Sequence, residues 1–388
     1  MSVRKALIVG IHHWNSPLRV GTHYITQYFL DQGFKVAHLS APLTPLHHLL
    51  PKTDDLAQRR ANNASGGCTE AKGQLWHYVP YALLAPDSRP FLSSSLVFNY
   101  WQILSFPDVI GVIRRAGFSD VDVLFLDSIY QPFWLTAINY KASAYRLADN
   151  TSGFTGYSRS AGTVEKRILS QVDMVFTASH GLQAYASLNG ASAIEHLANG
   201  VDLERFSKSN ASTDVILPEL KGPVAIYIGA ISYWFDHQTV LQLASQNPNL
   251  NILLIGPNNS GLTEYEDLPN IHMIDSVPAE HIPAYLSLAN VGLIPFNVNE
   301  YPRLVNDVNP LKLYEYMAAG LPVVSYRWKE LEHLDSPAHL VDSREAFVKV
   351  VSAILDQGSS GENEQLFASQ HDWNHTLKPL GDWIDRNV

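Results

Sequence analysis

Short apolar runs alternate with segments of helical periodicity along most of this 388-residue chain. In the first half, runs typical of buried strands occupy 5–11, 35–40, 121–128, 174–179 and 193–198. Segments with helical periodicity lie between them, at 21–32, 129–140, 159–171 and 180–188. This strand–helix–strand rhythm restricts the chain to α/β folds built on a parallel, doubly wound sheet.

The rhythm stops in a polar stretch of small residues and then begins again. Strand-like runs recur at 224–230, 251–256, 271–275, 291–296 and 321–326, with helix-like segments at 236–246, 279–288, 310–319 and 344–356. A chain of this length is too long for one core. We therefore predict two Rossmann-like α/β domains that face a cleft, where ligands meet the carboxyl ends of the strands.

The predicted domain boundaries follow the composition of the chain. The first predicted domain spans 1–205, and the second spans 223–370. Residues 206–222 form the linker between them, because they contain SKSNASTD and a Pro-Gly-Pro pattern. The remaining segment, 371–388, is predicted to be a helix that returns to the first domain.

Composition excludes several classes of protein. Hydrophobic residues make up 46% and charged residues 16%, as in a soluble globular protein. The net charge of −10, with scattered Lys and Arg, disfavours a nucleic-acid partner. Cys68 is the only cysteine, so the chain has no disulfide framework and no zinc cluster. No apolar run reaches the roughly 20 residues of a membrane span, which predicts a cytoplasmic location.

The segment NPLKLYEYMAAGLPVV predicts a short helix with an anion site at its start. Asn309 is expected to cap the helix and Pro310 to occupy its first position, so that backbone N–H groups point outward there. Lys312 places a positive charge in the first turn, against the helix dipole, which a bound phosphate would explain. Gly320 is a natural helix end before a buried strand.

Other residues of the second half could complete a nucleotide site. Glu315 lies one turn after Lys312 and could hold a ribose diol, although a surface ion pair is the plain alternative. Gly229 at a strand end could let backbone approach a phosphate, although a turn glycine explains it as well. Phe296 could stack on a base, or it could simply pack in the core.

The first half carries one acid and one polar loop of interest. Asp149 lies just past the carboxyl end of a strand, where catalytic residues of such sheets tend to sit; an Asx-turn or capping aspartate is the alternative. The loop GIHHWNSPLRVGTH contains His13, Trp14 and Arg19, and we interpret it as one wall of a substrate site. Its histidines lack the spacing of a helical metal pair, so no metal site is predicted.

Segment 80–106 is rich in Leu, Phe, Tyr and Trp. It could be a core helix with its approach loop. It could also be a partly exposed apolar surface that touches a bilayer or a lipid acceptor.

Together these motifs resemble those of the two-domain GT-B glycosyltransferases. NPLKLYEYMAAGLPVV is similar to the donor-binding helix of the retaining family 4, in which a Lys lies near the diphosphate and a later Glu holds the ribose. HLANGVDLERF resembles a segment that precedes the linker in that superfamily. Trp373 resembles the tryptophan before its last helix.

The first half is similar instead to glycosyltransferase family 70, the family of the xanthan glucuronosyltransferase. The similar stretches are YRLADNTSG, VEKRILSQVD, MVFTASHGL, HHWNSPLRVGTHYITQ, VPYALLAPDSRP and, in the second domain, GAISYWFD. This resemblance implies that Asp149 is the general base and that Lys312 contacts the donor. At the Glu315 position that family has a different polar residue, so the donor helix is closer to family 4.

These observations predict a metal-independent, inverting glycosyltransferase that needs no cofactor. It would move a sugar from a nucleotide-sugar, with UDP as the expected nucleotide, to a glycan or lipid-linked acceptor in surface polysaccharide synthesis. The protein would contact anionic membrane peripherally through 80–106. The first domain would bind the acceptor, and the second would bind the donor. The predicted donor-binding residues are Gly229, Ala230, Ile231, Phe296, Asn309, Leu311, Lys312 and Glu315. The predicted acceptor-binding residues are His13, Trp14 and Arg19. Two alternatives stay open, a retaining family 4-type transferase and a non-catalytic nucleotide-sugar-binding subunit.

Overall fold

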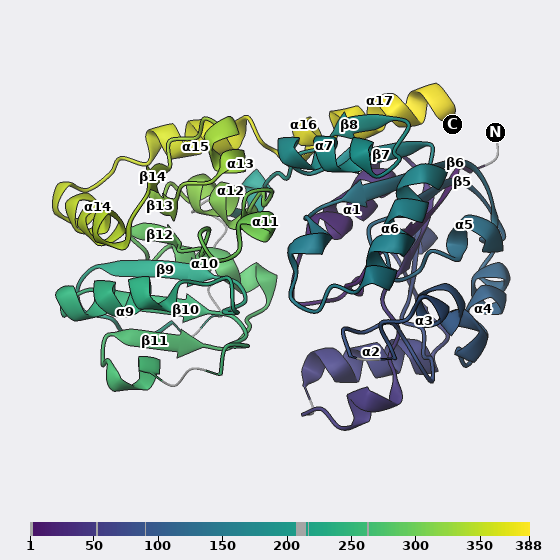
Figure 1. Ribbon diagram of the computed structural model, residues 1–388, viewed down its shortest axis with the longest axis horizontal. Helices are drawn as coiled ribbons and strands as arrows, with labels where there is room; N and C mark the ends of the chain where they lie inside the picture. Colours follow the sequence, from purple (N-terminus) through teal and green to yellow (C-terminus); the bar gives the residue numbers. More distant parts are fainter. Residues whose placement is uncertain (1–2, 52, 90, 207–214, 216, 262–263) are drawn as a thin grey trace. The chain divides into compact units, whose positions relative to one another are not determined.

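The computed structural model describes residues 3–51, 53–89, 91–206, 215, 217–261 and 264–388. The chain forms two compact units (Figure 1), the first made of Met1–Ala198 with Leu377–Val388 and the second of Asn199–Thr376. Each unit is an α/β domain around a largely parallel sheet. The predicted architecture of two parallel-sheet domains is therefore confirmed.

The first unit is built on an eight-stranded sheet with the order β3-β4-β2-β1-β5-β6-β7-β8. All neighbouring strands are parallel except β3 and β4, which form an antiparallel pair at one edge. The strands are β1 (Lys5–Val9), β2 (Lys35–Leu39), β3 (Cys68–Glu70), β4 (Leu75–Tyr78), β5 (Asp120–Leu126), β6 (Asn139–Leu147), β7 (Met174–Thr177) and β8 (Ile194–His196).

Helices and 3-10 turns connect these strands. They are α1 (Gly21–Asp31), η1 (Pro45–His48), α2 (Asp54–Ala64), η2 (Ala71–Gly73), α3 (Ser95–Tyr100), η3 (Trp101–Leu104), α4 (Val109–Arg115), α5 (Trp134–Ala137), η4 (Thr151–Gly153), α6 (Arg159–Gln171), α7 (His180–Leu188) and the C-terminal α17 (Lys378–Asn387). The helix predicted at 129–140 is wrong except for α5. From Asn139 onward the chain pairs with β5 instead, and this pairing holds it in the sheet.

The second unit has a six-stranded, fully parallel sheet with the order β11-β10-β9-β12-β13-β14. Its strands are β9 (Val224–Ile228), β10 (Asn251–Ile255), β11 (Ile271–Ile274), β12 (Val291–Ile294), β13 (Val323–Tyr326) and β14 (His339–Val341). Its helices and 3-10 turns are α8 (Leu203–Phe206), α9 (His237–Gln246), η6 (Glu264–Asp267), η7 (Ala279–His281), α10 (Ile282–Leu286), α11 (Pro302–Val305), α12 (Leu311–Ala318), α13 (Lys329–His333), α14 (Arg344–Gln357), α15 (Glu362–Ser369) and α16 (Trp373–Thr376).

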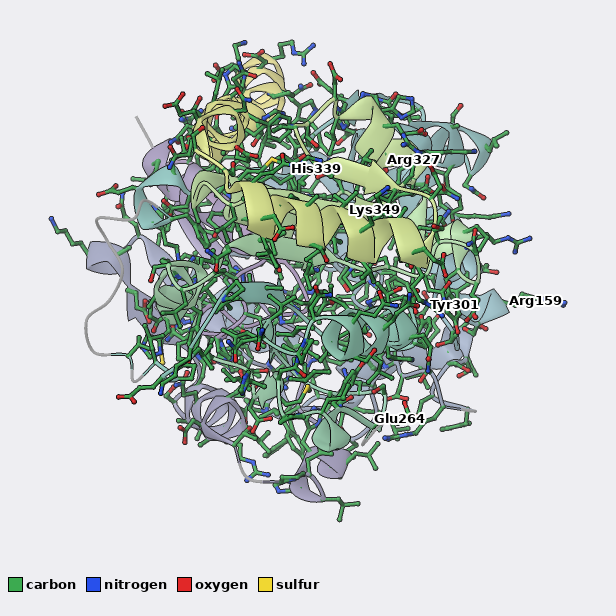
Figure 2. The ribbon with its side chains drawn as sticks, turned by 90° about the vertical axis from the view of Figure 1, so that its left-hand side faces the viewer. Arg159, Glu264, Tyr301, Arg327, His339 and Lys349 are labelled. Atoms are coloured by element: carbon green, nitrogen blue, oxygen red, sulfur yellow. The ribbon has the colours of Figure 1, made fainter. Side chains whose placement is uncertain are left out.

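The central strands are apolar along nearly their whole length because helices cover both faces of each sheet. Four of the five residues of β1, β2 and β10 are buried, and so are all four of β12. A continuous apolar run, instead of an alternating one, is what a parallel sheet between two helical layers requires. Polar helix faces remain outside; Figure 2 shows Lys349 on α14, with Arg327 and His339 also carried at the surface of the second unit.

The boundary between the units lies after Ala198, seven residues before the predicted one. Residues 199–206 pack in the second unit because Val201 exchanges backbone hydrogen bonds with the segment around Trp373, and Phe206 is buried in that unit's core. Most of the linker predicted at 206–222, namely 207–214 and 216, falls outside the described residues.

The C-terminal helix α17 belongs to the first unit. The indole of Trp383 packs edge-on against Phe176 of β7, with ring centroids 5.8 Å apart. Arg386 pairs with Glu195 of β8 at 3.5 Å. Among the described residues, no helix is both long and apolar enough to cross a membrane.

Candidate active site

Helix α12 begins one residue later than the sequence predicts. Pro310 occupies the N-cap position with extended backbone, and Leu311 is the first helical residue. Asn309 does not cap the helix, which corrects our expectation. Its side chain is buried and bonded elsewhere, accepting from the Tyr314 hydroxyl at 2.8 Å and donating to Glu330 at 3.3 Å. Asn309 therefore stabilises the turn before α12 through these two buried hydrogen bonds.

The first turn of α12 nevertheless keeps donors available. Among the described residues, none accepts a hydrogen bond from the N–H groups of Leu311 or Lys312. Such orphan donors at a helix start carry partial positive charge and suit an anion. The other end of the helix is closed as predicted: Gly320 has φ +74°, and the N–H groups of Gly320 and Leu321 donate to Met317 and Tyr316.

Lys312 is half-buried and lies against aromatic rings instead of a carboxylate. Its Nζ is 4.7 Å from the ring centroid of Phe296 and 5.0 Å from that of Tyr227. No described carboxylate lies within 4.0 Å of it. Burial lowers the pKa of Lys312 to about 8, and the charge of Glu315 offsets part of that effect. The site thus holds a cation that forms no ion pair with a described carboxylate, although the charge of Glu315 acts on it.

Glu315 lies one turn further along the same face of α12. Its carboxylate is half-buried and accepts no hydrogen bond from a described residue. Burial raises its pKa, while the charges of Arg205 and Lys312 act in the opposite direction. A desolvated carboxylate without donors is costly, and hydroxyl groups of a ligand would supply the missing donors.

Gly229 brings the end of β9 beside Lys312. Its φ of +142° is unfavourable for a residue with a side chain. A Cβ on Gly229 would lie 3.2 Å from Nζ of Lys312, so backbone and ammonium share one site. Ala230 is half-buried next to it, and none of the hydrogen bonds among the described residues uses its N–H.

Besides Asn309, two further predicted donor-binding residues lie in the core. Ile231 is fully buried, and its N–H and carbonyl are already bonded to Pro257 and Asn259. Phe296 is only 6% exposed, because its ring stacks on Trp328 at 5.7 Å. Phe296 therefore packs in the core, which is the alternative to stacking on a base. The candidate donor site of the second unit therefore consists of Gly229 and Ala230 after β9, and of Leu311, Lys312 and Glu315 on α12.

Asp149 lies two residues beyond the carboxyl end of β6, in the first unit. Its carboxylate is half-buried and makes no hydrogen bond with a described residue, so the Asx-turn alternative is not seen. Asn150, not Asp149, precedes the 3-10 turn η4. Burial raises the pKa of Asp149; the charge of Arg146 lowers it and that of Asp127 raises it further. A carboxylate with free lone pairs and a raised pKa is suited to accept a proton.

The sequence reasoning missed the ion pair beside Asp149. Arg146 and Asp127 are both nearly fully buried and form a salt bridge of 3.2 Å. Thr22 donates to the same aspartate, and Gly21 at the start of α1 leaves room for the guanidinium. The sequence did contain a signal for this pair: Asp127 directly follows β5, and Asp149 lies shortly after β6. Because the carboxyl ends of neighbouring parallel strands lie at the same edge of the sheet, the two aspartates could be expected near each other.

One residue of the N-terminal loop, His13, does not fit its predicted role as an acceptor contact. His13 is 5% exposed, and its Nε2 is 2.7 Å from a carboxylate oxygen of Asp55 in α2. Because the ring is buried in this pair, it is not available to contact a sugar acceptor. Trp14 and Arg19 are half-buried. The indole donates to Glu70 at 3.1 Å, and the Arg19 guanidinium lies 5.0 Å from the Trp14 ring.

Two further histidines, His23 of α1 and His38 of β2, pack against Trp14 of this loop. His23 and His38 lie with ring centroids 5.7 Å apart, both near Trp14. Burial lowers the pKa of His23 to about 3 and that of His38 to about 4, so both rings are neutral at physiological pH. These histidines therefore support the loop without adding charge.

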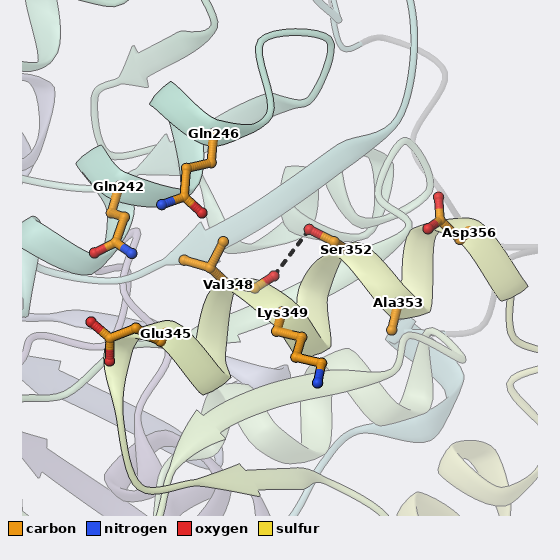
Figure 3. A pocket seen from close by; sticks show the side chains of 8 residues that line it. All are labelled: Gln242, Gln246, Glu345, Val348, Lys349, Ser352, Ala353 and Asp356. Carbon is orange, nitrogen blue, oxygen red and sulfur yellow. Dashed lines mark hydrogen bonds between the residues drawn. The ribbon is translucent and has the colours of Figure 1, made fainter.

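A separate pocket of about 480 Å³ lies between α9 and α14 (Figure 3). Its lining residues are Gln242, Gln246, Glu345, Val348, Lys349, Ser352, Ala353 and Asp356. None of the predicted site residues lines it. The pocket is therefore not the site described above.

Solved structures show the same fold over almost the whole chain. A sucrose-phosphate synthase from Thermosynechococcus elongatus has a TM-score of 0.71 at 15% identity, covering 99% of this chain and 98% of that one. Anabaena HepE in complex with UDP-glucose has a TM-score of 0.66 at 13% identity, covering 98% and 99%. A trehalose-6-phosphate protein from E. coli bound with UDP-2-fluoro glucose has a TM-score of 0.66 at 12% identity, covering 99% of each chain.

The family matches decide the identification. Residues 8–178 match the family described as glucuronosyltransferase GumK, N-terminal domain, and residues 222–357 match the family described as glycosyl transferases group 1. The chain is a GT-B glycosyltransferase. The resemblance of its first half to family 70 and of its donor helix to family 4 is thereby confirmed.

This GT-B glycosyltransferase is also similar to a protein of Bacillus subtilis (strain 168). That protein, TuaH, is assigned to teichuronic acid biosynthesis as a glycosyltransferase. The two are 27% identical over 234 residues, which is 56% of this chain and 58% of TuaH. The match thus spans a little over half of the relative's length.

Proposed function

We propose that this glycosyltransferase moves a sugar from a UDP-sugar to a glycan or lipid-linked acceptor during synthesis of a surface polysaccharide. The observation that carries the proposal is the ammonium of Lys312, which pairs with no described carboxylate, beside the N–H groups of α12 that no described residue accepts from. Similar solved structures are complexes with UDP-glucose and with UDP-2-fluoro glucose, which supports the choice of nucleotide. The assignment of TuaH supports the class of product.

In this proposal the second unit binds the donor. The diphosphate lies on the N–H groups of Leu311 and Lys312 and on the Lys312 ammonium, close to the Gly229 backbone. The ribose diol donates to the carboxylate of Glu315, which has no other donor among the described residues. The proposal leaves out Ile231, Phe296 and Asn309, because their side chains are buried in other contacts.

The first unit binds the acceptor and supplies the base. Asp149 removes the proton of the acceptor hydroxyl while that oxygen attacks the anomeric carbon, and the bond to the diphosphate breaks with inversion. Trp14 and Arg19 remain the proposed acceptor contacts. Charge that develops on the leaving diphosphate is stabilised by Lys312 and the helix N–H groups.

These groups can neutralise the leaving diphosphate without a metal ion, so we propose a metal-independent reaction in the cytoplasm. EDTA should then leave sugar transfer unchanged. Strong inhibition by EDTA that manganese or magnesium reverses would contradict this part of the proposal.

Six apolar side chains of the predicted membrane segment 80–106 are exposed in the first unit, and we refer to them together as the apolar surface. Its side chains are Leu83, Phe91, Leu96, Tyr100, Ile103 and Phe106, each more than half exposed. Leu83 donates its backbone N–H to Leu104, which joins the two ends of this surface. Trp101 is fully buried, so it is core and not part of the surface. We propose that this apolar surface contacts anionic membrane beside a lipid-linked acceptor.

Two measurements separate this function from its alternatives. The anomeric configuration of the product, determined by NMR, distinguishes the inverting reaction from a retaining one of family 4 type. Incubation with a panel of UDP-sugars and lipid-linked acceptors tests catalysis itself. Absence of both transfer and donor hydrolysis, together with tight UDP binding, would leave a non-catalytic nucleotide-sugar-binding subunit as the better description.

A further inference from the structure

A buried carboxylate lies directly beneath the loop that carries Asp149. Glu165 of α6 is fully buried, and four hydroxyl groups donate to it. Its Oε1 accepts from Thr151 at 2.7 Å and from Tyr145 at 3.3 Å, and its Oε2 accepts from Tyr185 at 2.5 Å and from Tyr157 at 3.1 Å. Both oxygens are therefore fully used by the protein.

This arrangement holds the carboxylate in one place. A buried carboxylate is expensive unless donors satisfy it, so any displacement of Glu165 loses several bonds at once. The donors come from four separate segments: strand β6, turn η4, the loop before α6, and helix α7. Burial, followed by interactions with Glu165, raises the pKa of Tyr157 to about 12 and keeps its hydroxyl a donor. Glu165 thus joins the segments on both sides of Asp149.

One of the four bonds reaches the Asp149 loop itself. Thr151 begins turn η4, two residues after Asp149. The turn is closed by the Gly153 N–H, which donates to the Asn150 carbonyl at 2.9 Å, and by Ser152, which donates to the Asn150 side chain at 2.6 Å. Asp149 makes no hydrogen bond of its own with a described residue. Its position therefore depends on the turn that follows it.

We propose that Glu165 is a positioning residue, which holds the Asp149 carboxylate in place through the Thr151 hydroxyl. The inference rests on the proposed function, in which Asp149 is the general base. Glu165 does not touch the reacting atoms. Its effect on the reaction passes through η4, and a base displaced by even about 1 Å loses much of its effect on the rate.

The charged neighbours of Asp149 give this role a measurable signature. Arg146 and Asp127 are the charged groups that act on it, and burial is the main cause of its raised pKa. A loosened turn would let water reach the carboxylate and lower that pKa toward its ordinary value. The acid limb of the kcat profile would then move to lower pH, which a simple loss of stability would not produce.

The test compares three single substitutions in the intact chain, with UDP-sugar and acceptor as substrates. Thr151→Val keeps the shape of the side chain but removes the bond to Glu165. Thr151→Ser keeps the hydroxyl and should restore the bond. Tyr185→Phe also removes one bond to Glu165, but from α7 and not from the Asp149 loop, so it controls for damage to the cluster.

We expect Thr151→Val to lower kcat about tenfold or more, with unchanged UDP affinity and an acid limb shifted to lower pH. Thr151→Ser should behave like the wild type, and Tyr185→Phe should keep kcat within about twofold of it. Wild-type kcat in Thr151→Val, or an equal loss in Tyr185→Phe, would overturn the proposal. A different result would show that Asp149 is not the base at all: the Asp149→Asn variant would then keep full activity.

Discussion

The ammonium of Lys312 lies 4.7 Å from the ring centroid of Phe296, and no described carboxylate pairs with it. An aromatic face attracts a cation, but only weakly compared with a diphosphate at the same point. The unliganded protein thus keeps a charge that a donor can neutralise. The donor-site predictions below depend on this relationship.

Lys312→Ala should weaken UDP binding by about 1.5–3 kcal/mol, the range for losing a hydrogen bond to a charged group. The fold should persist, because the ammonium makes no ion pair with a described residue. Isothermal calorimetry with UDP measures the change, and circular dichroism checks the fold. An unaltered affinity would contradict the placement of the diphosphate.

UDP affinity should fall as the pH rises from about 7 to about 9. Burial lowers the pKa of Lys312 to about 8, so the free protein loses the ammonium above that pH and must regain a proton to bind the diphosphate. The loss should be at most about tenfold per pH unit, since one proton is involved. Lys312→Ala is the control: its weaker affinity should lack this dependence.

Glu315→Gln should weaken UDP binding about tenfold while leaving the unliganded protein at least as stable. Burial raises the pKa of Glu315, which means that folding disfavours its ionised form near neutral pH. Removing the charge removes that penalty, but it also removes an acceptor for the ribose. Thermal unfolding with and without UDP measures both effects. A clear drop in stability without UDP, combined with normal binding, would exclude the ribose role.

Asp149→Asn should preserve UDP affinity and reduce turnover about a hundredfold or more, the usual scale for a general base. In the wild type the acid limb of kcat should lie above the ordinary aspartate range, because burial raises the pKa of Asp149. Steady-state kinetics across pH test both statements. If the Asn variant turns over normally, the base must be sought elsewhere.

The apolar surface should bind anionic vesicles but not neutral ones, and salt should weaken the binding. Cationic side chains near an anionic surface contribute about 1 kcal/mol each, and Arg89, which belongs to the same segment, is exposed. Ile103→Glu with Phe106→Glu should abolish co-sedimentation, since these side chains are 72% and 79% exposed. Leu188→Glu, at a position on α7 that is 86% exposed and lies outside this segment, is the control. No binding by the wild type at low salt would favour a soluble acceptor.

Local sequence determined the elements that build the site. The apolar runs predicted β1, β2, β9, β10 and β12 because a strand covered on both faces must be apolar throughout. The spacing of Lys312 and Glu315 placed them on one face of α12, as helical geometry requires. Pro310 and Gly320 marked the two ends of that helix to within a residue. These properties depend on neighbours within one or two turns.

Tertiary structure alone decided which polar and aromatic side chains remain available. His13 is taken by Asp55, 42 residues away, and Phe296 is covered by Trp328. Asn309 would have capped an isolated helix, but the Tyr314 hydroxyl and Glu330 occupy its amide. Each group bonds to whatever the fold places beside it, because an unsatisfied buried polar group costs free energy. The sequence contains these partners but not the distances between them.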